Sequence, residues 1–188
     1  FMIRAKSPEL GGFSFDGFVA LGHDVDYFEW SSATVLFSNL GLTYRPTEKL
    51  RFEGSVPLLV HYRRDGSRVD GTIVPRLKVE YQVTRSVFLR VVGEYDSEYH
   101  DDLRDNARTN YPVLIRDPGT GIYRRDLALR QETNSFNVDW LFSYHPTPGT
   151  VFFAGYGSSL AEDQAFRFRG LKRLRDGFFT KFSYLFRL

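Results

Sequence analysis

The chain has 188 residues and a formal net charge of +2, and its composition is 42% hydrophobic and 16% aromatic. Its length suits one domain, and the small net charge, with basic residues spread along the chain, argues against nucleic-acid binding. The lack of cysteine excludes disulfides, zinc–thiolate sites and iron–sulfur clusters, and no apolar run reaches the roughly eighteen residues of a transmembrane helix.

Alternation of apolar and polar residues predicts β-strands along most of the chain. Pro75 is expected at a strand start and Pro57 at a bulge, because proline lacks the N–H that a β-ladder uses. The chain opens without the pattern of a signal peptide, so either processing has removed one or the chain is the C-terminal part of a longer protein. Residues 1–5 read as the tail of an earlier strand, which favours the second alternative. In chain order the predicted strands cover residues 12–22, 33–45, 50–62, 74–83, 87–95, 138–144, 149–159 and 177–188.

The last predicted strand has the strongest pattern. Apolar side chains recur at every second position back from Leu188, and Lys181, Ser183 and Arg187 lie between them. A strand that is apolar on one face and polar on the other suits the wall of a membrane barrel. The ending also resembles the signal by which bacterial barrel-assembly machinery recognises its substrates.

The alternation divides the strand residues into two sets, one expected to face lipid and one to face the lumen of a barrel. The lipid-facing set is Leu50, Phe52, Leu58, Val60, Leu77, Val79, Tyr81, Leu89, Val91, Trp140, Phe142, Tyr144, Phe182, Tyr184, Phe186 and Leu188. The lumen-lining set is Arg51, Glu53, His61, Arg63, Arg76, Lys78, Glu80, Arg90, Glu94, Asp139, Lys181 and Arg187.

Short and long connections alternate along the chain. Turn residues predict short connections at 45–48, 83–86 and 145–149, and longer ones at 22–32, 64–71, 97–133 and 160–176. With the C-terminus in the periplasm, counting back through the strands places every short turn on the periplasmic side, as in bacterial outer-membrane barrels. The sequence therefore predicts an all-β, antiparallel up-and-down transmembrane barrel of about eight strands, or the C-terminal part of a larger one.

A resemblance to a known family rests on separated segments that occur in the same order along this chain as in the family. They are residues 42–50, 77–90, 94–96, 141–153 and 181–188. They include the Arg45-Pro46 turn and the His145-Pro146-Thr147-Pro148-Gly149 turn. Together they resemble the C-terminal barrel of large bacterial outer-membrane proteins of unknown function that carry an N-terminal carbohydrate-binding domain similar to family nine modules. The resemblance implies a barrel of more than eight strands and a carbohydrate-binding domain upstream in the periplasm, and it lends no catalytic residues.

Metal-binding and catalytic candidates are weak. The runs His23-Asp24-Val25-Asp26 and Tyr99-His100-Asp101-Asp102 hold oxygen and imidazole ligands, but their spacing matches no strong metal motif, and solvated loop charges are the default reading. No motif links His23, His61, His100 or His145 to a serine nucleophile. We therefore expect no enzyme activity, no metal and no cofactor.

Two long connections have alternative interpretations. The basic residues Arg167, Arg169, Lys172, Arg173 and Arg175 suit lipopolysaccharide phosphates, or form an ordinary solvated loop. The connection 97–133 mixes tyrosines, prolines and both charges, which fits a folded lid, an external binding surface or a disordered segment.

The lumen-lining residues likewise allow two functions. They either line an aqueous pore or form a charge network that fills a narrow barrel. The leading expectation is an outer-membrane channel or solute-uptake barrel; the rival is a sealed barrel that anchors a carbohydrate-binding domain or binds ligands by its loops. A soluble lipocalin-like barrel, with the apolar face inward, is a more distant alternative. Expected partners are outer-membrane lipid and lipopolysaccharide, barrel-assembly machinery, and carbohydrate or small solutes.

Overall fold

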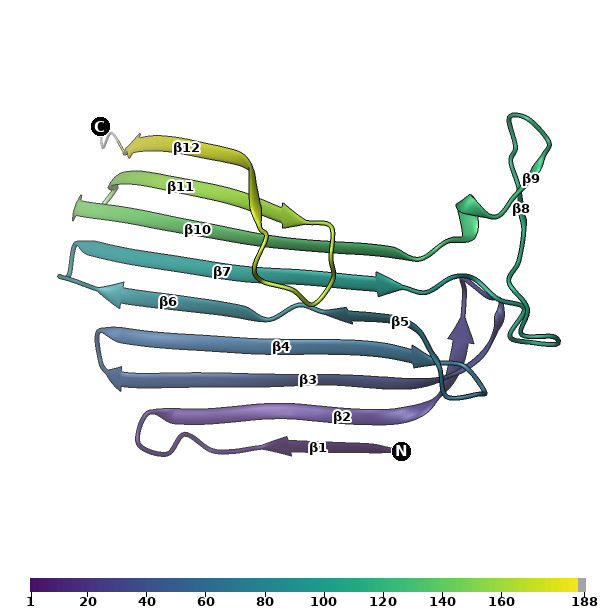
Figure 1. Ribbon diagram of the computed structural model, residues 1–188. Coiled ribbons are helices and arrows are strands. Elements are labelled where there is room, and N and C mark those ends of the chain that lie inside the picture. Colours follow the sequence, from purple (N-terminus) through teal and green to yellow (C-terminus); the bar gives the residue numbers. More distant parts are fainter. Residues whose placement is uncertain (186–188) are drawn as a thin grey trace.

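The computed structural model describes residues 1–185, and β-strands make up nearly all of its regular structure (Figure 1). One antiparallel sheet holds ten strands. They are β1 (Met2–Lys6), β2 (Phe13–Asp26), β3 (Ser31–Thr47), β4 (Leu50–Tyr62), β5 (Arg68–Ile73), β6 (Arg76–Gln82), β7 (Val87–His100), β10 (Gln131–Thr147), β11 (Thr150–Glu162) and β12 (Lys172–Tyr184). The connection after β7 holds a small separate sheet, β8 (Ile115–Arg116) with β9 (Tyr123–Arg124), and the 3₁₀ turn η1 (Asp126–Ala128).

The strands of the large sheet follow one another in space in the same order as in the chain. β5 and β6 share one place, between β4 and β7. The edge strands are β1 and β12, and within residues 1–185 each of them pairs with one neighbour only. The predicted all-β, antiparallel up-and-down arrangement is confirmed. In the described part of the chain no helix is long and apolar enough to cross a membrane.

The predicted strand segments coincide with strands, and several strands are longer than predicted. β7 and β10 stay paired from Val87 opposite Tyr144 to His100 opposite Gln131. Residues 68–70, predicted as part of a loop, begin β5. The strand residues outside the predicted segments are mostly polar, so the hydrophobic alternation did not reveal them. They belong to strands because hydrogen bonds to the neighbouring strand satisfy their backbone N–H and C=O groups. Residues 186–188 of the last predicted strand lie outside the described residues.

Two prolines lie near the break between β5 and β6: Pro75 within the break itself, and Pro57 on β4, next to it. Pro75 directly precedes β6, as predicted. The predicted bulge at Pro57 is wrong, because the β3–β4 register runs without a shift through Asn39 opposite Pro57. On the side of β4 away from β3, the Val74 N–H donates to the Pro57 carbonyl at 3.1 Å. The break therefore lies where Pro57 has no N–H to offer the neighbouring strand.

Short and long connections lie at opposite ends of the sheet (Figure 1). Residues 7–12, 48–49, 83–86 and 148–149 join neighbouring strands at one end, and the connection 7–12 is the longest of these four. At the other end the connections are residues 27–30, 63–67, 101–130 and 163–171. The predicted alternation of short and long connections is thus present from β3 to β12, although each long connection is shorter than predicted because the strands extend into it.

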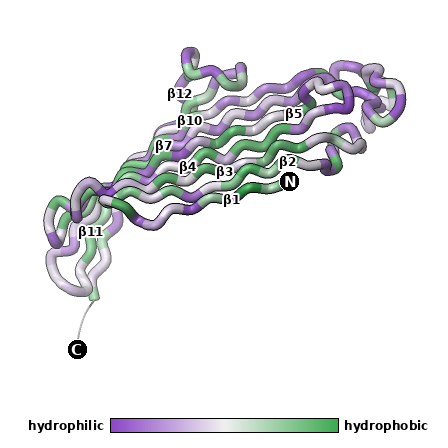
Figure 2. Tube along the Cα trace, turned by 90° about the horizontal axis from the view of Figure 1, so that it is seen from below, coloured by the Kyte–Doolittle hydropathy of each residue, from purple (hydrophilic) through white to green (hydrophobic). Residues whose placement is uncertain are grey.

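The register sorts side chains onto two chemically different faces. One unbroken row of paired residues crosses eight strand positions and is apolar throughout: Phe13, Tyr44, Phe52, Val79, Val91, Trp140, Tyr156 and Phe178. We call the side with this row the apolar face, and the opposite side, which carries Lys78, the polar face. Figure 2 shows hydrophobic and hydrophilic residues alternating along the strands, with hydrophilic residues predominating in the connections.

The sheet does not bury its apolar face against another layer. The buried hydrophobic residues among those described are Ala33, Val60, Val69 and Ala128. Large side chains of the apolar face remain open instead; Leu40 is 58% exposed and Leu77 is 52% exposed. A contiguous apolar surface of this extent marks a region that contacts something apolar, because exposure of such a surface to water is unfavourable.

Candidate functional site

The two predicted sets of residues separate onto the two faces. On the polar face the register places Arg51, Glu53, His61, Arg76, Lys78, Glu80, Arg90, Glu94, Asp139 and Lys181. On the apolar face it places Leu50, Phe52, Leu58, Val60, Leu77, Val79, Tyr81, Leu89, Val91, Trp140, Phe142, Tyr144, Phe182 and Tyr184. Arg63 lies just beyond β4 in a connection, and Arg187, Phe186 and Leu188 lie outside the described residues.

Charges of opposite sign neighbour one another on the polar face. Glu53 pairs with Lys78 in the register, and its Oε2 lies 2.5 Å from the Lys78 Nζ. Lys78 also contacts Glu80 at 3.3 Å, and Arg51 forms an ion pair with Glu53. Directly opposed strand residues interact strongly enough to order their side chains. The result is a connected charge network on β4 and β6 rather than isolated ions.

The polar face is hollowed beside this network. A hollow of about 330 Å³ is lined by Asn39, Glu53, Arg76 and Lys78, among others. Within the described residues, the buried Asn39 Oδ1 and Arg51 Nε atoms have no hydrogen-bond partner. Buried polar atoms of this kind are ordinarily satisfied by water or by a bound polar molecule. The face is therefore suited to contact with water or polar solutes.

A buried arginine organises the end of the sheet that carries the long connections. The Arg63 side chain is fully buried, and its Nη2 donates to the Glu29 Oε1 at 2.6 Å. Its Nη1 donates to the Asp101 Oδ2 at 2.7 Å and to the Arg68 carbonyl at 3.1 Å. Nη2 also donates to the Asp102 carbonyl at 2.9 Å. One guanidinium thus joins three connections, 27–30, 63–67 and 101–130.

Additional hydrogen bonds strengthen this loop cluster, by which we mean residues 27–31, 63–67 and 101–110. Glu29 also accepts a hydrogen bond from the Arg104 N–H at 2.9 Å, and the Asn106 Nδ2 donates to the Ser31 Oγ at 2.8 Å. Asn110 Nδ2 donates to the Asp65 Oδ2 at 2.9 Å. The part of the long connection nearest the sheet is therefore folded and tied to its neighbours.

Electrostatics hold the loop cluster in one ionisation state. Burial opposes ionisation of the Asp101 carboxyl, but its hydrogen bond and charge interaction with Arg63 outweigh burial and hold its pKa below the ordinary value. Burial likewise opposes the charge on Arg63, and the hydrogen bonds to Glu29 and Asp101 outweigh it, so the Arg63 pKa is raised. Both groups are therefore charged at neutral pH.

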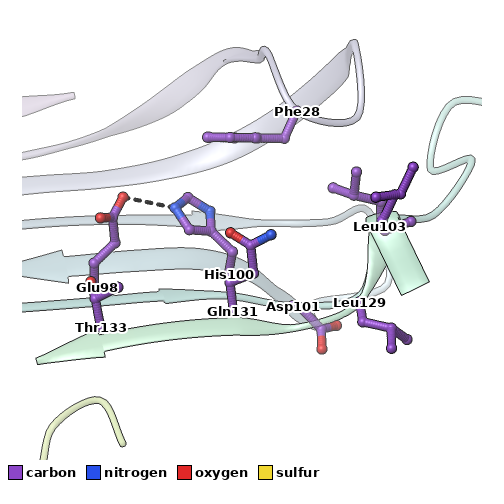
Figure 3. Close-up of a pocket in the computed structure, with 10 residues that line it drawn as sticks. Phe28, Glu98, His100, Asp101, Leu103, Leu129, Gln131 and Thr133 are labelled. Atoms are coloured by element: carbon purple, nitrogen blue, oxygen red, sulfur yellow. Dashed lines mark hydrogen bonds and ion pairs between the residues drawn. The ribbon is translucent and has the colours of Figure 1, made fainter. Parts of the chain in front are cut away.

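A cavity of about 380 Å³ lies under the loop cluster, against the polar face (Figure 3). The Phe28 ring covers His100, with ring centroids 4.4 Å apart. Figure 3 shows Leu103 and Leu129 to the right of both rings. The His100 Nε2 lies 2.7 Å from the Glu98 Oε1. The loop cluster and these apolar side chains narrow access to this end of the polar face.

The residues predicted as weak metal candidates are not brought together. Strand alternation puts His23 on the apolar face and Asp24 on the polar face. Asp26 caps the next turn, accepting from the Phe28 N–H at 2.9 Å, and Asp102 accepts from the Arg130 N–H at 2.7 Å. Across residues 1–185, no three His, Asp or Glu side chains are grouped so as to hold a metal ion.

The sequence reasoning missed a Ser–His contact. The Ser143 Oγ lies 2.6 Å from the His145 Nε2, since residues two apart on a strand share a face. That spacing was the available signal. Ser143 is only 2% exposed, and no carboxylate of the described chain is hydrogen-bonded to His145. The pair lacks both the access and the third group that a nucleophilic triad requires.

Comparison of the chain with models of protein families, with curated proteins and with solved structures found no match. The resemblance to outer-membrane proteins with a carbohydrate-binding domain therefore stays a prediction.

Removing the Arg63 guanidinium should open the loop cluster. In Arg63→Met the Glu29 and Asp101 carboxylates stay partly or fully buried without their partner, and we expect a loss of about 3–5 kcal/mol in local stability. Amide hydrogen exchange across residues 101–110 measures this loss. Arg64→Met, at the exposed neighbouring position, is the control. Equal exchange in both variants would contradict the role of Arg63.

Acid should loosen the same cluster through Asp101. A carboxyl whose pKa is depressed in the folded state stabilises it fully above the ordinary pKa, and this stabilisation is lost as pH falls through the folded value. Arg63, Tyr99 and Arg104 face this carboxylate. We expect hydrogen-exchange protection factors of residues 101–106 to stay constant near neutrality and fall below the ordinary Asp pKa of about 3.9. Asp101→Asn should show a smaller acid-dependent change, and an unchanged acid dependence would contradict this assignment.

Proposed function

We propose that this chain forms the wall, or the C-terminal part of the wall, of an outer-membrane β-barrel that passes solutes without catalysis. The observation that carries the proposal is the division of the sheet into an exposed apolar face and a charged polar face, maintained by one register from β2 to β12. Such a wall places the apolar face against lipid and the polar face toward an aqueous lumen.

Strand length supports a membrane location. β3 and β10 each have 17 residues, and β4, β11 and β12 each have 13. A tilted strand needs about 9–11 residues to cross the hydrocarbon core, whereas strands of soluble proteins have a mode near 5–6. These strands are long enough to cross the core and extend beyond it.

Aromatic residues on the apolar face also fit a bilayer. Tyr44, Tyr81, Tyr144 and Tyr184 lie near the short-turn ends of β3, β6, β10 and β12. Tyrosine favours the membrane–water boundary, where its ring is in an apolar layer and its hydroxyl reaches water. This set corresponds to the girdle of aromatic residues found at the interfaces of outer-membrane barrels.

The lumen would select solutes by charge and by the width left beneath the loop cluster. Arg51, Arg76, Lys78, Glu80, Arg90 and Glu94 are the residues we assign to the solute path. Arg63 acts indirectly, because its buried guanidinium holds the connections that narrow the outer end. Closure of the wall requires the free edges of β1 and β12 to pair, either with each other or with further strands.

Location and partners follow from the same proposal. The short turns and the end of β12 would lie on the periplasmic side, and the loop cluster outside. Lipid and lipopolysaccharide would contact the wall, and barrel-assembly machinery would recognise the last strand. A carbohydrate-binding domain preceding the barrel, and carbohydrate as a solute, remain predictions from the resemblance described above.

Two observations favour the alternatives. The ion pairs around Glu53 and the loop cluster would fill or cap a narrow lumen, which suits a sealed barrel that anchors or binds. An apolar hollow of about 860 Å³ on the apolar face would suit a soluble lipocalin-like barrel in which that face is turned inward. Folding and conductance measurements separate these alternatives from the channel.

Charge placed on the apolar face should oppose folding into a bilayer. We expect Val79→Arg and Phe142→Arg each to lower the free energy of unfolding by about 2–4 kcal/mol if the positions lie near the midplane. Lys78→Gln, one residue away on the polar face, is the control and should change folding little. Urea titration of protein refolded into phospholipid vesicles measures the effect. Folding in buffer without lipid would instead indicate a soluble barrel.

Conductance tests the channel itself. In planar bilayers we expect steady single-channel currents whose ion selectivity shifts toward cations in Lys78→Glu and Arg90→Glu, because both remove a positive charge from the polar face. Arg85→Glu makes the same charge change in the short turn 83–86 and should shift selectivity less. Inserted, folded protein without conductance would contradict the channel and favour the sealed barrel.

A further inference from the structure

The connection between β11 and β12 folds back onto the apolar face instead of extending away from the sheet. Figure 1 shows it crossing β10 and β7. The Phe168 ring packs against Tyr95 and Phe136, with centroid separations of 5.6 and 5.2 Å. The Tyr95 hydroxyl donates to the Arg167 carbonyl at 3.1 Å, and the Phe166 N–H donates to the Ser97 Oγ at 2.6 Å. The segment is therefore anchored on this face.

This anchoring places arginines without a carboxylate partner at the outer end of the apolar face, where the Arg167 Nη1 donates to the amide oxygen of Gln164. Arg167 and Arg169 lie on either side of Phe168, and the Arg68 guanidinium lies 5.7 Å from the Phe166 ring centroid. Within residues 1–185, none of these three guanidinium groups forms an ion pair with a carboxylate. They are thus available to an external anion.

An apolar hollow begins where this basic segment ends. Tyr95 and Phe136, which hold Phe168, also line the apolar hollow of about 860 Å³. Gly54 and Gly93 form part of its floor, each opposite Leu77 in the register. A Cβ atom added at Gly54 would have no neighbour nearer than 4.0 Å, so the missing side chain leaves real space. Tyr95 and Phe136 therefore connect the hollow to the segment that carries Arg167 and Arg169.

We propose that this surface binds one phosphorylated, acylated membrane lipid, with an acyl chain in the hollow and a phosphate against Arg167 and Arg169. The inference rests on the proposed function, since it requires the apolar face to meet lipid. Arginine and phosphate form short, charge-assisted hydrogen bonds, often bidentate. A lipid with a net anionic head matches both halves of the surface, whereas the phosphate of a zwitterionic lipid is offset by the cation of its own head group and is attracted less strongly.

Trp140 provides a reporter for the test. It lies opposite Val91 and two residues from Val138, both of which line the hollow. In a Trp30→Phe background Trp140 is the only tryptophan. The protein would be inserted into phosphatidylcholine vesicles. Some vesicles would contain a small fraction of phosphatidic acid with brominated chains, which quench tryptophan fluorescence, and others the same fraction of brominated phosphatidylcholine. We expect Trp140 quenching to saturate at a much lower fraction of the brominated phosphatidic acid.

Matched variants separate the two halves of the site. Arg167→Gln combined with Arg169→Gln should weaken the preference for phosphatidic acid about tenfold, since a charge-assisted hydrogen bond contributes at least the free energy of one decade in affinity. Gly54→Leu should reduce it by filling the hollow. Arg85→Gln in a short turn and Gly177→Leu on the polar face are the controls and should keep the preference.

The outcomes distinguish this site from the proposed function. Equal quenching by both brominated lipids, unchanged in the arginine variants, would overturn the lipid site while leaving the face in contact with lipid. No quenching by either lipid, even as the bulk component, would mean that Trp140 does not face the bilayer, and both proposals would fail. A preference retained in the arginine variants would also overturn the assignment of the phosphate to these two residues.

Discussion

The structure depends above all on a register that never slips by one residue in the body of the sheet. Because side chains alternate along a strand, a slip of one residue could place Lys78 on the apolar face opposite Val91, and Val79 on the polar face opposite Arg90. Register shifts do occur, but they lie near strand ends: between Tyr44 and Thr47, His61 and Tyr62, Tyr144 and Thr147, and Ser159 and Leu160. The central rows cross the sheet without interruption, and the two faces keep their separate chemistry.

The same constraint explains why the sheet has so little conventional core. Most of its large apolar side chains point to one side, and within residues 1–185 only the connection between β11 and β12 packs on that side, so further burial must come from the surroundings. The polar side is different, because its charges have partners within the sheet itself, as in the Glu53–Lys78 pair. One face is thus nearly complete on its own, and the other requires an apolar environment.

Cohesion at the long-connection end comes from polar contacts. The Arg63 guanidinium touches Glu29, Asp101 and two backbone carbonyls, so three connections depend on one side chain. Buried ion pairs often add little net stability, but they make the loss of one partner costly and so define a specific arrangement. In this chain they hold three connections together over that end of the polar face, and in the proposed barrel the extent of this cover would separate a channel from a sealed barrel.

The sequence by itself determined the strand positions, the alternation of short and long connections, and the membership of the two faces. These features are local, since the period of two along a strand identifies each face without knowledge of its neighbours. The alternation of apolar and polar residues did not extend into the polar ends of β7 and β10. There Ser97 and Asn134 belong to strands because the two strands pair at these positions, and not because of a hydrophobic pattern. The missing N–H of Pro57 led to the prediction of a bulge, which is wrong, because the sequence does not show that the neighbouring strand breaks opposite this proline.

Only the tertiary structure decided which distant residues meet. Arg63 and Glu29 are separated by 34 positions, and Tyr95 and Arg167 by 72, so no spacing along the chain pairs them. Arg63 was predicted as one member of a charged row and instead lies buried at the centre of the loop cluster. The basic segment after β11 was identified by its composition, but its packing on the apolar face follows from Phe168 finding Tyr95 and Phe136 on two other strands. Contacts of this kind arise when the sheet brings separate strands together, and a one-dimensional pattern contains no record of them.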